Sequence, residues 1–164
     1  SKRFSCCGAR IGAVITRNEK GYQSVLKFAQ ARLCPPTIEQ KMALAAYRMG
    51  RSYFDPVQKE YQHRRDVLYE GLKDIPGIVI RKPQGAFYYI VRLPIDDSEH
   101  FVRWMLTDFN LDNETVMVAP AQGFYSTPGK GTNEVRIAYV LKEEDLKRAI
   151  TVFRAGLQEY MNRA

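Results

Sequence analysis

The stretch QGAFYYIVRLP at residues 84–94 contains an aromatic and β-branched run, AFYYIV at 86–91, between a glycine and a proline. Runs of this composition, bounded by turn-forming residues, are typical of β-strands. Three further runs have the same character: IVIRK at 78–82, TVMVA at 115–119 and VRIAYV at 135–140. The sequence therefore predicts a sheet of short strands between residues 78 and 140.

Helical patterns surround these strands. One helix is expected near residues 98–108. A second helix is expected to start at Asp55-Pro56-Val57-Gln58, which supplies a capping residue, a proline in the first turn and a glutamine three residues after the cap. Pro76-Gly77 limits this second helix at its C-terminal end. The C-terminal segment has an acidic first turn, apolar residues at helical spacing and a basic end: residues 143–145, then Leu146, Ile150, Phe153 and Leu157, then Arg163. Strands covered by helices predict an α+β fold.

The first fifty residues have a different pattern. IGAVIT at 11–16 is typical of a strand buried on both faces, KGYQ at 20–23 predicts a turn, and a capping signal predicts a helix over 37–50. A doubly buried strand needs neighbours on both sides, and the sequence offers none. We therefore expect residues 1–50 to be the tail end of a larger α/β domain and residues 51–164 to form a smaller domain.

Composition limits the class of protein. The 164 residues are 45% hydrophobic and 26% charged, which allows a substantial core. No apolar run approaches the roughly 20 residues that cross a bilayer, and no signal pattern is present, so we expect a cytoplasmic protein without membrane association. The net charge of +7 comes from basic residues spread among acids, so no nucleic-acid partner is expected. Cys6, Cys7 and Cys34 lack metal-site spacing, so we expect reduced, buried thiols and no metal.

The chain opens with SKRFSCCGARIG, residues 1–12, in which Lys2 and Arg10 stand close to glycines. Glycines let a backbone approach an anion closely, while lysine and arginine supply positive charge. The group indicates a phosphate site, although a single lysine is more often a solvated surface charge.

This string resembles the pyridoxal-phosphate attachment segment of the class I and II aminotransferases, in which Ser-Lys is followed by Gly-x-Arg-x-Gly. The resemblance continues through residues 84–94 and 116–140, and the aspartate-aminotransferase-like branch is the most similar. It departs at Pro120-Ala121, where many members carry Pro-Gly. The resemblance implies a transferase of amino-acid metabolism with a fold type I architecture, beginning in the large cofactor-binding domain and ending with the C-terminal small domain.

The resemblance also implies a role for each matching residue. Lys2 would hold pyridoxal 5'-phosphate as a Schiff base and move the proton between substrate and cofactor. Arg10 would bind the cofactor phosphate, and Ser1 would add a hydroxyl to the same phosphate. Gly8 and Gly12 would permit close approach and a tight turn.

Arg136 lies in an otherwise apolar strand, between Val135 and Ile137. On pattern alone, an edge strand with Arg136 facing water is slightly favoured. An inward arginine would require an anionic partner, because an unpaired buried charge is very costly. The corresponding arginine of the family binds the α-carboxylate of the substrate, so the resemblance favours that role for Arg136.

The other aromatic residues and the histidines have simpler interpretations. Core positions are expected for Phe87, Tyr88, Tyr89 and Phe124. His63 and His100 lack partners at catalytic or metal spacing, so we expect ordinary surface or boundary residues.

Family members bind the pyridine ring through residues that precede the attachment lysine, and their pocket lies at a dimer interface. We therefore expect the intact protein to be a homodimeric aminotransferase for amino-acid and 2-oxo-acid substrates, and this chain to be inactive or nearly so by itself. Two alternatives stay open: a lyase or decarboxylase using the same cofactor, and a non-catalytic interaction or regulatory relative. A basic nucleic-acid-binding module ranks last.

Overall fold

The computed structural model describes residues 3–163, which group into two units, Ser1–Asp55 and Pro56–Ala164. The boundary falls inside helix α3 (Arg51–Leu72). The division into a large-domain remnant over 1–50 and a small domain over 51–164 stays a prediction.

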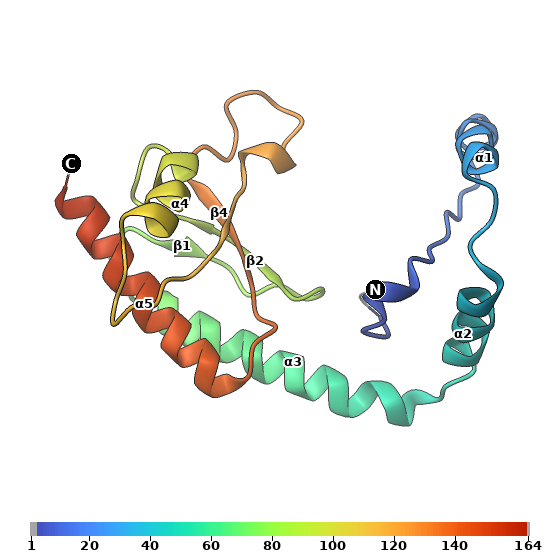
Figure 1. Ribbon diagram of the computed structural model, residues 1–164, viewed down its shortest axis with the longest axis horizontal. Coiled ribbons are helices and arrows are strands. Elements are labelled where there is room, and N and C mark those ends of the chain that lie inside the picture. Colours follow the sequence, from blue (N-terminus) through green and yellow to red (C-terminus); the bar gives the residue numbers. More distant parts are fainter. Residues whose placement is uncertain (1–2, 164) are drawn as a thin grey trace. The chain divides into compact units, whose positions relative to one another are not determined.

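The Pro56–Ala164 unit is built on one antiparallel sheet with the strand order β1-β2-β4-β3. Figure 1 labels β1, β2 and β4. Its strands are β1 (Val79–Ile80), β2 (Tyr88–Arg92), β3 (Ala119–Pro120) and β4 (Glu134–Ala138). The two strongest predicted runs form β2 and β4, which are paired along their whole length. The runs at 78–82 and 115–119 are paired over much shorter stretches than predicted. Residues 115–118 have no partner strand in the described part of the chain, which explains the brevity of β3.

One face of the sheet shares a core with three helices. These are the second half of α3, α4 (Ser98–Thr107) and α5 (Glu143–Asn162), so the α+β prediction is confirmed. The fully buried side chains include Leu72 from α3, Phe101 and Met105 from α4, Leu146 and Leu157 from α5, and Tyr89, Val91 and Val135 from the sheet. Burial of each large apolar side chain stabilises the fold by about 1.5–3 kcal/mol, so this core defines the unit.

Helix α3 differs from its prediction at both ends. It begins at Arg51, so Asp55 is not its cap and Pro56 lies inside it. A proline near a helix start removes only one backbone hydrogen bond, which the helix tolerates. The helix ends at Leu72, before Pro76-Gly77, and the Ile75 backbone N–H donates to the Leu72 carbonyl in the turn that follows.

The Ser1–Asp55 unit contains a 3-10 turn, η1 (Cys7–Ala9), and two helices, α1 (Glu19–Arg32) and α2 (Thr37–Tyr47). Helix α2 confirms a prediction, although no capping box forms at its start, because Gln40 donates to the Pro35 carbonyl instead. The predicted turn at 20–23 is wrong. Asn18 accepts a hydrogen bond from the Gly21 backbone N–H and so caps α1, which runs through that stretch.

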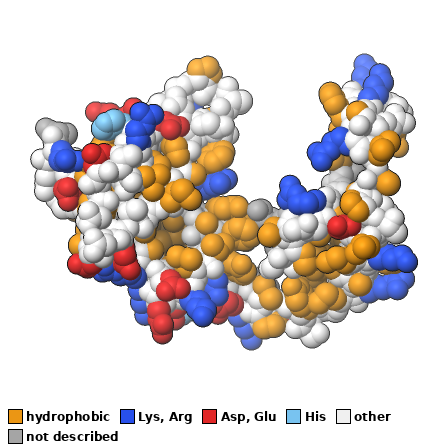
Figure 2. Space-filling view, viewed as in Figure 1, with side chains coloured by type: hydrophobic (Ala, Val, Ile, Leu, Met, Phe, Trp, Pro, Cys, Tyr) orange, Lys and Arg blue, Asp and Glu red, His pale blue; other side chains and the backbone are white. Residues whose placement is uncertain are grey.

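The predicted strand at 11–16 is also wrong. These residues have no ladder partner in the described part of the unit, and Ile15 is 96% exposed. Large apolar side chains of α2 are exposed as well, namely Ile38, Met42, Leu44 and Tyr47. Figure 2 shows hydrophobic surface in the region of this helix. Within residues 3–55, Ala9 is the one buried apolar side chain, so this unit has no core of its own.

No helix within residues 3–163 combines the length and the apolar character that a membrane span requires.

Candidate active site

The first candidate site is the segment that precedes α1. Lys2 and Ser1 lie outside the described residues, so the structure places only Arg10 of the three predicted cofactor ligands. Arg10 ends η1 with a left-handed backbone (φ 47°), and its Nη1 donates to the Cys7 carbonyl at 3.1 Å. Its side chain is exposed, and no ion pair among the described residues includes it.

The glycines beside Arg10 leave open space around it. A Cβ atom at Gly8 or Gly12 would meet no heavy atom within 4 Å. An exposed guanidinium without an acidic partner, next to two positions without side-chain bulk, suits a phosphate group. The described residues of this segment therefore fit the phosphate of pyridoxal phosphate.

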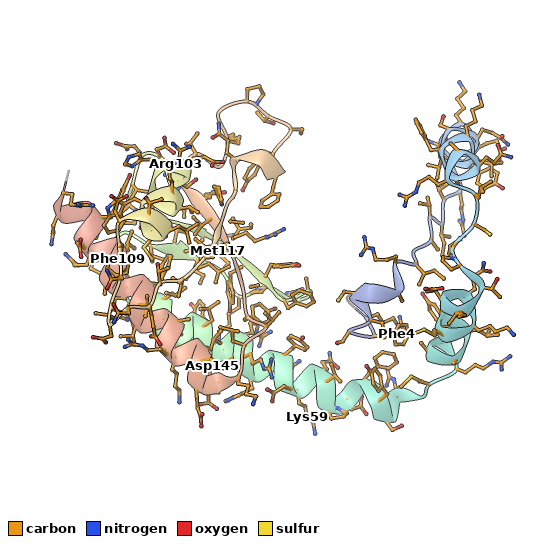
Figure 3. The ribbon with its side chains drawn as sticks, viewed as in Figure 1. Phe4, Lys59, Arg103, Phe109, Met117 and Asp145 are labelled. Carbon is orange, nitrogen blue, oxygen red and sulfur yellow. The ribbon has the colours of Figure 1, made fainter. Side chains whose placement is uncertain are left out.

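An aromatic cluster anchors this segment to the helices of its own unit. The Phe4 ring packs at 5.4 Å from Tyr47 and 5.6 Å from Phe54, measured between ring centres, and Tyr53 lies beside them (Figure 3). The Tyr53 hydroxyl also donates to the Phe4 carbonyl at 3.4 Å. This role of Phe4 was not predicted, although an apolar ring two residues after a candidate lysine was a usable signal.

The second candidate site surrounds Arg136 on β4. This strand lies between β2 and β3, and Arg136 stands opposite Ile90 on one side and Ala119 on the other. The alternative of an edge strand is therefore wrong. Val135 points into the core, so Arg136 points to the opposite face of the sheet, as successive residues of a strand do.

Two aromatic rings hold the Arg136 guanidinium. Its central carbon lies 4.5 Å from the centre of the Tyr88 ring and 4.4 Å from the centre of the Phe124 ring. The residue is half-buried, and no ion pair among residues 3–163 includes it. Guanidinium groups stack well on aromatic faces, and the planar edge then stays available for two parallel hydrogen bonds to a carboxylate.

These contacts correct part of the predicted core. Tyr89 is 1% exposed and lies in the core, as expected. Phe87 is half-buried and packs against this core. Phe124 is 53% exposed, and it serves as a platform for Arg136 instead of filling the interior.

The loop that carries Phe124 is tied to β4. Phe124 belongs to the 3-10 turn η2 (Gln122–Phe124), and the Tyr125 hydroxyl donates to the Glu134 carboxylate. This hydrogen bond raises the pKa of Tyr125 above its ordinary value. Ala121, where the family pattern expected from the sequence has glycine, has φ −94°, which any residue adopts without strain. The departure from the family pattern therefore leaves the turn intact.

The histidines match their prediction and the cysteines do not. His63 and His100 are exposed, and each has one hydrogen-bonding side-chain partner, Glu143 at 2.7 Å and Tyr160 at 2.6 Å respectively. Burial was predicted for the thiols, but Cys6, Cys7 and Cys34 are all exposed. They lie in the Ser1–Asp55 unit, whose described residues form no core, so no interior is available there to receive them.

Comparisons with known proteins define the class of the fold first. The structure matches an aromatic aminotransferase from Pyrococcus horikoshii with a TM-score of 0.76, at 30% identity, over 98% of this chain and 42% of that one. It also matches an α-aminoadipate aminotransferase from Thermus thermophilus with a TM-score of 0.79, at 20% identity, over 96% of this chain and 40% of that one. The fold is that of part of a fold type I aminotransferase.

Sequence comparison then identifies the family. The profile of aminotransferase class I and II matches residues 1–153. An aspartate aminotransferase from Sulfurisphaera tokodaii is 33% identical over 156 residues, which are 92% of this chain and 37% of that protein. The chain belongs to the class I and II aminotransferase family, whose members use pyridoxal phosphate, and it spans about 40% of the length of the relatives that it matches.

Proposed function

We propose that this chain is the C-terminal part of an aspartate-aminotransferase-like enzyme that transfers an amino group between an amino acid and a 2-oxo acid. The observation that carries the proposal is Arg136, half-buried on an inner strand between Tyr88 and Phe124. A guanidinium in such a place, without an acidic partner among residues 3–163, suits a carboxylate that arrives from solution.

Arg136 would bind the α-carboxylate of the substrate through the two nitrogens at the edge of its guanidinium. The rings of Tyr88 and Phe124, both within 4.5 Å of the guanidinium carbon, would restrict the motion of the guanidinium. A carboxylate bound to it is therefore held in one orientation, and the direction of the substrate α-C–H bond is restricted with it. Orientation of this kind favours removal of the α-proton over cleavage of the other bonds at that carbon.

The segment at residues 1–12 would hold the cofactor. Arg10 would bind the phosphate through paired N–H donors, Ser1 would add its hydroxyl, and Lys2 would attach the cofactor through Nζ and later carry the α-proton. Pyridoxal phosphate, when bound, supplies the electron sink that makes this proton acidic.

We also propose that activity requires a homodimer. It would further require the remaining part of an aminotransferase, which this chain does not span. The chain covers about 40% of its relatives, and the Ser1–Asp55 unit has no core of its own among its described residues. A transamination assay with a panel of amino-acid donors and 2-oxoglutarate is therefore expected to show no turnover by this chain. Measurable turnover would contradict the need for a further part.

Carboxylate binding at Arg136 is tested by NMR spectroscopy of the 15N-arginine-labelled chain, titrated with 2-oxoglutarate. One Nε–H resonance, assigned by its loss in Arg136→Lys, is expected to shift in a saturable manner. Arg103→Lys, at an exposed position on α4, is the matched control and should leave that shift unchanged. Absence of a saturable shift at Arg136, or an equal shift at every arginine, would overturn the assignment.

A further inference from the structure

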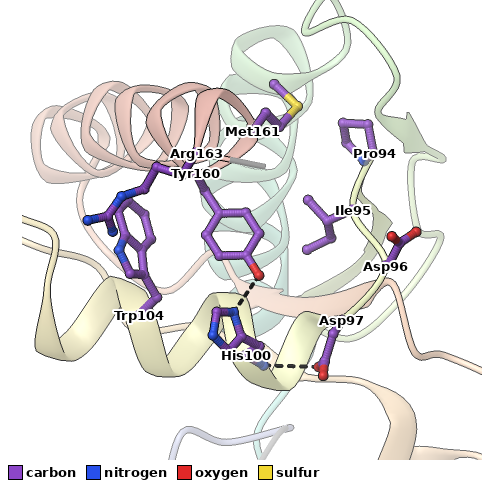
Figure 4. Close-up of a pocket in the computed structure, with 9 residues that line it drawn as sticks. All are labelled: Pro94, Ile95, Asp96, Asp97, His100, Trp104, Tyr160, Met161 and Arg163. Atoms are coloured by element: carbon purple, nitrogen blue, oxygen red, sulfur yellow. Dashed lines mark hydrogen bonds between the residues drawn. The ribbon is translucent and has the colours of Figure 1, made fainter.

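A pocket separate from both candidate sites lies in the Pro56–Ala164 unit, between the first turns of α4, the last turn of α5 and residues 94–97 (Figure 4). Its volume is about 610 Å³. Sites for small molecules typically measure about 300–1,000 Å³, so the pocket can hold a ligand of ordinary size. None of the residues proposed above for substrate or cofactor lines it.

One wall of this pocket is aromatic. The rings of Trp104 and Tyr160 are tilted against each other with their centres 5.3 Å apart. The Arg163 guanidinium carbon lies 5.0 Å from the centre of the Trp104 ring (Figure 4). The chain therefore already places a cation of its own on this wall, which shows that the wall accepts a guanidinium.

The opposite side of the pocket carries two carboxylates, Asp96 and Asp97 (Figure 4). No ion pair among the described residues includes either of them. Asp97 is partly engaged, because it accepts a hydrogen bond from the His100 backbone N–H at 3.0 Å and so caps α4. Asp96 is exposed and accepts no side-chain hydrogen bond from the described part of the chain, so its charge can attract a cation.

The carboxylates of Asp96 and Asp97 act electrostatically on Tyr160 in the aromatic wall. Burial, followed by the charges of Asp97 and Asp96, raises the pKa of Tyr160 above its ordinary value. The Tyr160 hydroxyl is held by His100 Nδ1 at 2.6 Å, which fixes the ring at the side of the pocket. Aromatic faces on one side and carboxylates on the other form a combination that binds organic cations.

We infer that this pocket binds a small organic cation, with a guanidinium or ammonium group placed between the aromatic wall of Trp104 and Tyr160 and the carboxylate of Asp96. Arg163 occupies part of that wall and competes with the ligand. The inference is independent of the proposed transamination, because it involves neither the cofactor segment nor Arg136.

The inference is tested with agmatine, which carries a guanidinium and an ammonium on one short chain. Its affinity for the 164-residue chain is measured by calorimetry, and its location by the emission of Trp104, the single tryptophan of the sequence. We expect saturable binding and a parallel change in emission. 1,5-Pentanediol, a neutral chain of similar length, should produce neither, and an equal response to the diol would overturn the inference.

Variants locate the ligand within the pocket. Asp96→Asn should weaken agmatine binding at least about fivefold, since a charge pair at contact distance contributes about 1 kcal/mol or more. Glu144→Gln removes an equal charge near the other end of α5, about 24 Å from Tyr160 along the helix, and should leave the affinity unchanged. Arg163→Gln should tighten binding. Unchanged affinity in Asp96→Asn, or weaker binding in Arg163→Gln, would overturn the inference.

Discussion

The guanidinium carbon of Arg136 lies 4.4 Å from the centre of the Phe124 ring, and the two residues come from different elements, β4 and η2. The proposed substrate anchor is thus positioned in part by a loop. That loop is fastened to β4 through Tyr125 and Glu134. The orientation of Arg136 therefore depends on residues that bind no substrate themselves.

Replacement of Phe124 tests this dependence. Phe124→Leu keeps an apolar side chain but removes the ring, and an exposed cation–π contact contributes about 0.5–1 kcal/mol. The affinity of Arg136 for 2-oxoglutarate is expected to fall about two- to fivefold, measured by the same NMR titration. Phe28→Leu, at a position 77% exposed on α1, is the matched control. Equal affinity in the Phe124 and Phe28 variants would contradict the positioning role.

The packing of α4 against α5 depends on Gly156. A Cβ atom there would collide with Met105 and would lie 3.1 Å from Phe109 Cε1. Gly156→Ala is therefore expected to destabilise the fold by roughly 1–3 kcal/mol, because the core has no room for a further methyl group. Urea denaturation followed by circular dichroism measures the effect.

Gly123→Ala is the control for that substitution. A Cβ atom at Gly123 meets no heavy atom within 4 Å, so the free energy of unfolding should change by less than about 0.5 kcal/mol. Equal destabilisation by the two alanine variants would show that close packing around position 156 does not explain the effect of Gly156→Ala.

The ion pairs of Glu143 make stability depend on pH. Lys147 and, secondly, His63 lower the pKa of Glu143 from 4.5 to about 2. A carboxyl group with a lowered pKa stabilises the folded chain above its ordinary pKa, and this contribution is lost as the pH falls toward the folded value. The stability difference between the unaltered chain and Glu143→Gln should therefore be present at neutral pH and shrink from about pH 4.5 to about pH 2.

Glu144→Gln serves as the comparison, since Glu144 shares the first turn of α5 but takes part in none of the ion pairs among residues 3–163. Both variants are measured by urea denaturation across this pH range. The ion-pair account is contradicted if both variants show the same pH dependence.

The sequence predicted those elements whose residue pattern is strong and whose packing partners lie within this chain. The spacing of Leu146, Ile150, Phe153 and Leu157 predicted α5, and each of these side chains is buried in the shared core. β2 and β4 were predicted because both are rich in β-branched and aromatic residues, and they pair with each other.

Prediction failed where the pattern depended on absent neighbours. The run at 11–16 has the composition of a buried strand, but a strand forms only when it hydrogen-bonds to a neighbouring strand, and no partner lies in the described part of its unit.

Helix α1 was missed because Gly21 suggested a turn, although Asn18 and Glu19 supplied a helix-start signal.

The candidate site was predicted only in part. Arg136 was singled out, but its two platforms were assigned to the core, because a sequence does not show which face of a strand or loop an aromatic residue takes. The pocket at Trp104 and Tyr160 joins α4 with the end of α5, two segments far apart in the sequence, and no local pattern indicates it.

The assignment of residues 1–12 to the cofactor is tested most directly by incubation with pyridoxal phosphate, borohydride reduction and mapping of the labelled peptides by mass spectrometry. We predict selective label on Lys2, separated by the mapping from the Ser1 α-amine, with loss of that selectivity in Arg10→Ala and no Lys2 label in Lys2→Ala. Label spread evenly over many lysines, or label on Lys2 that is unchanged in Arg10→Ala, would contradict the proposed cofactor site.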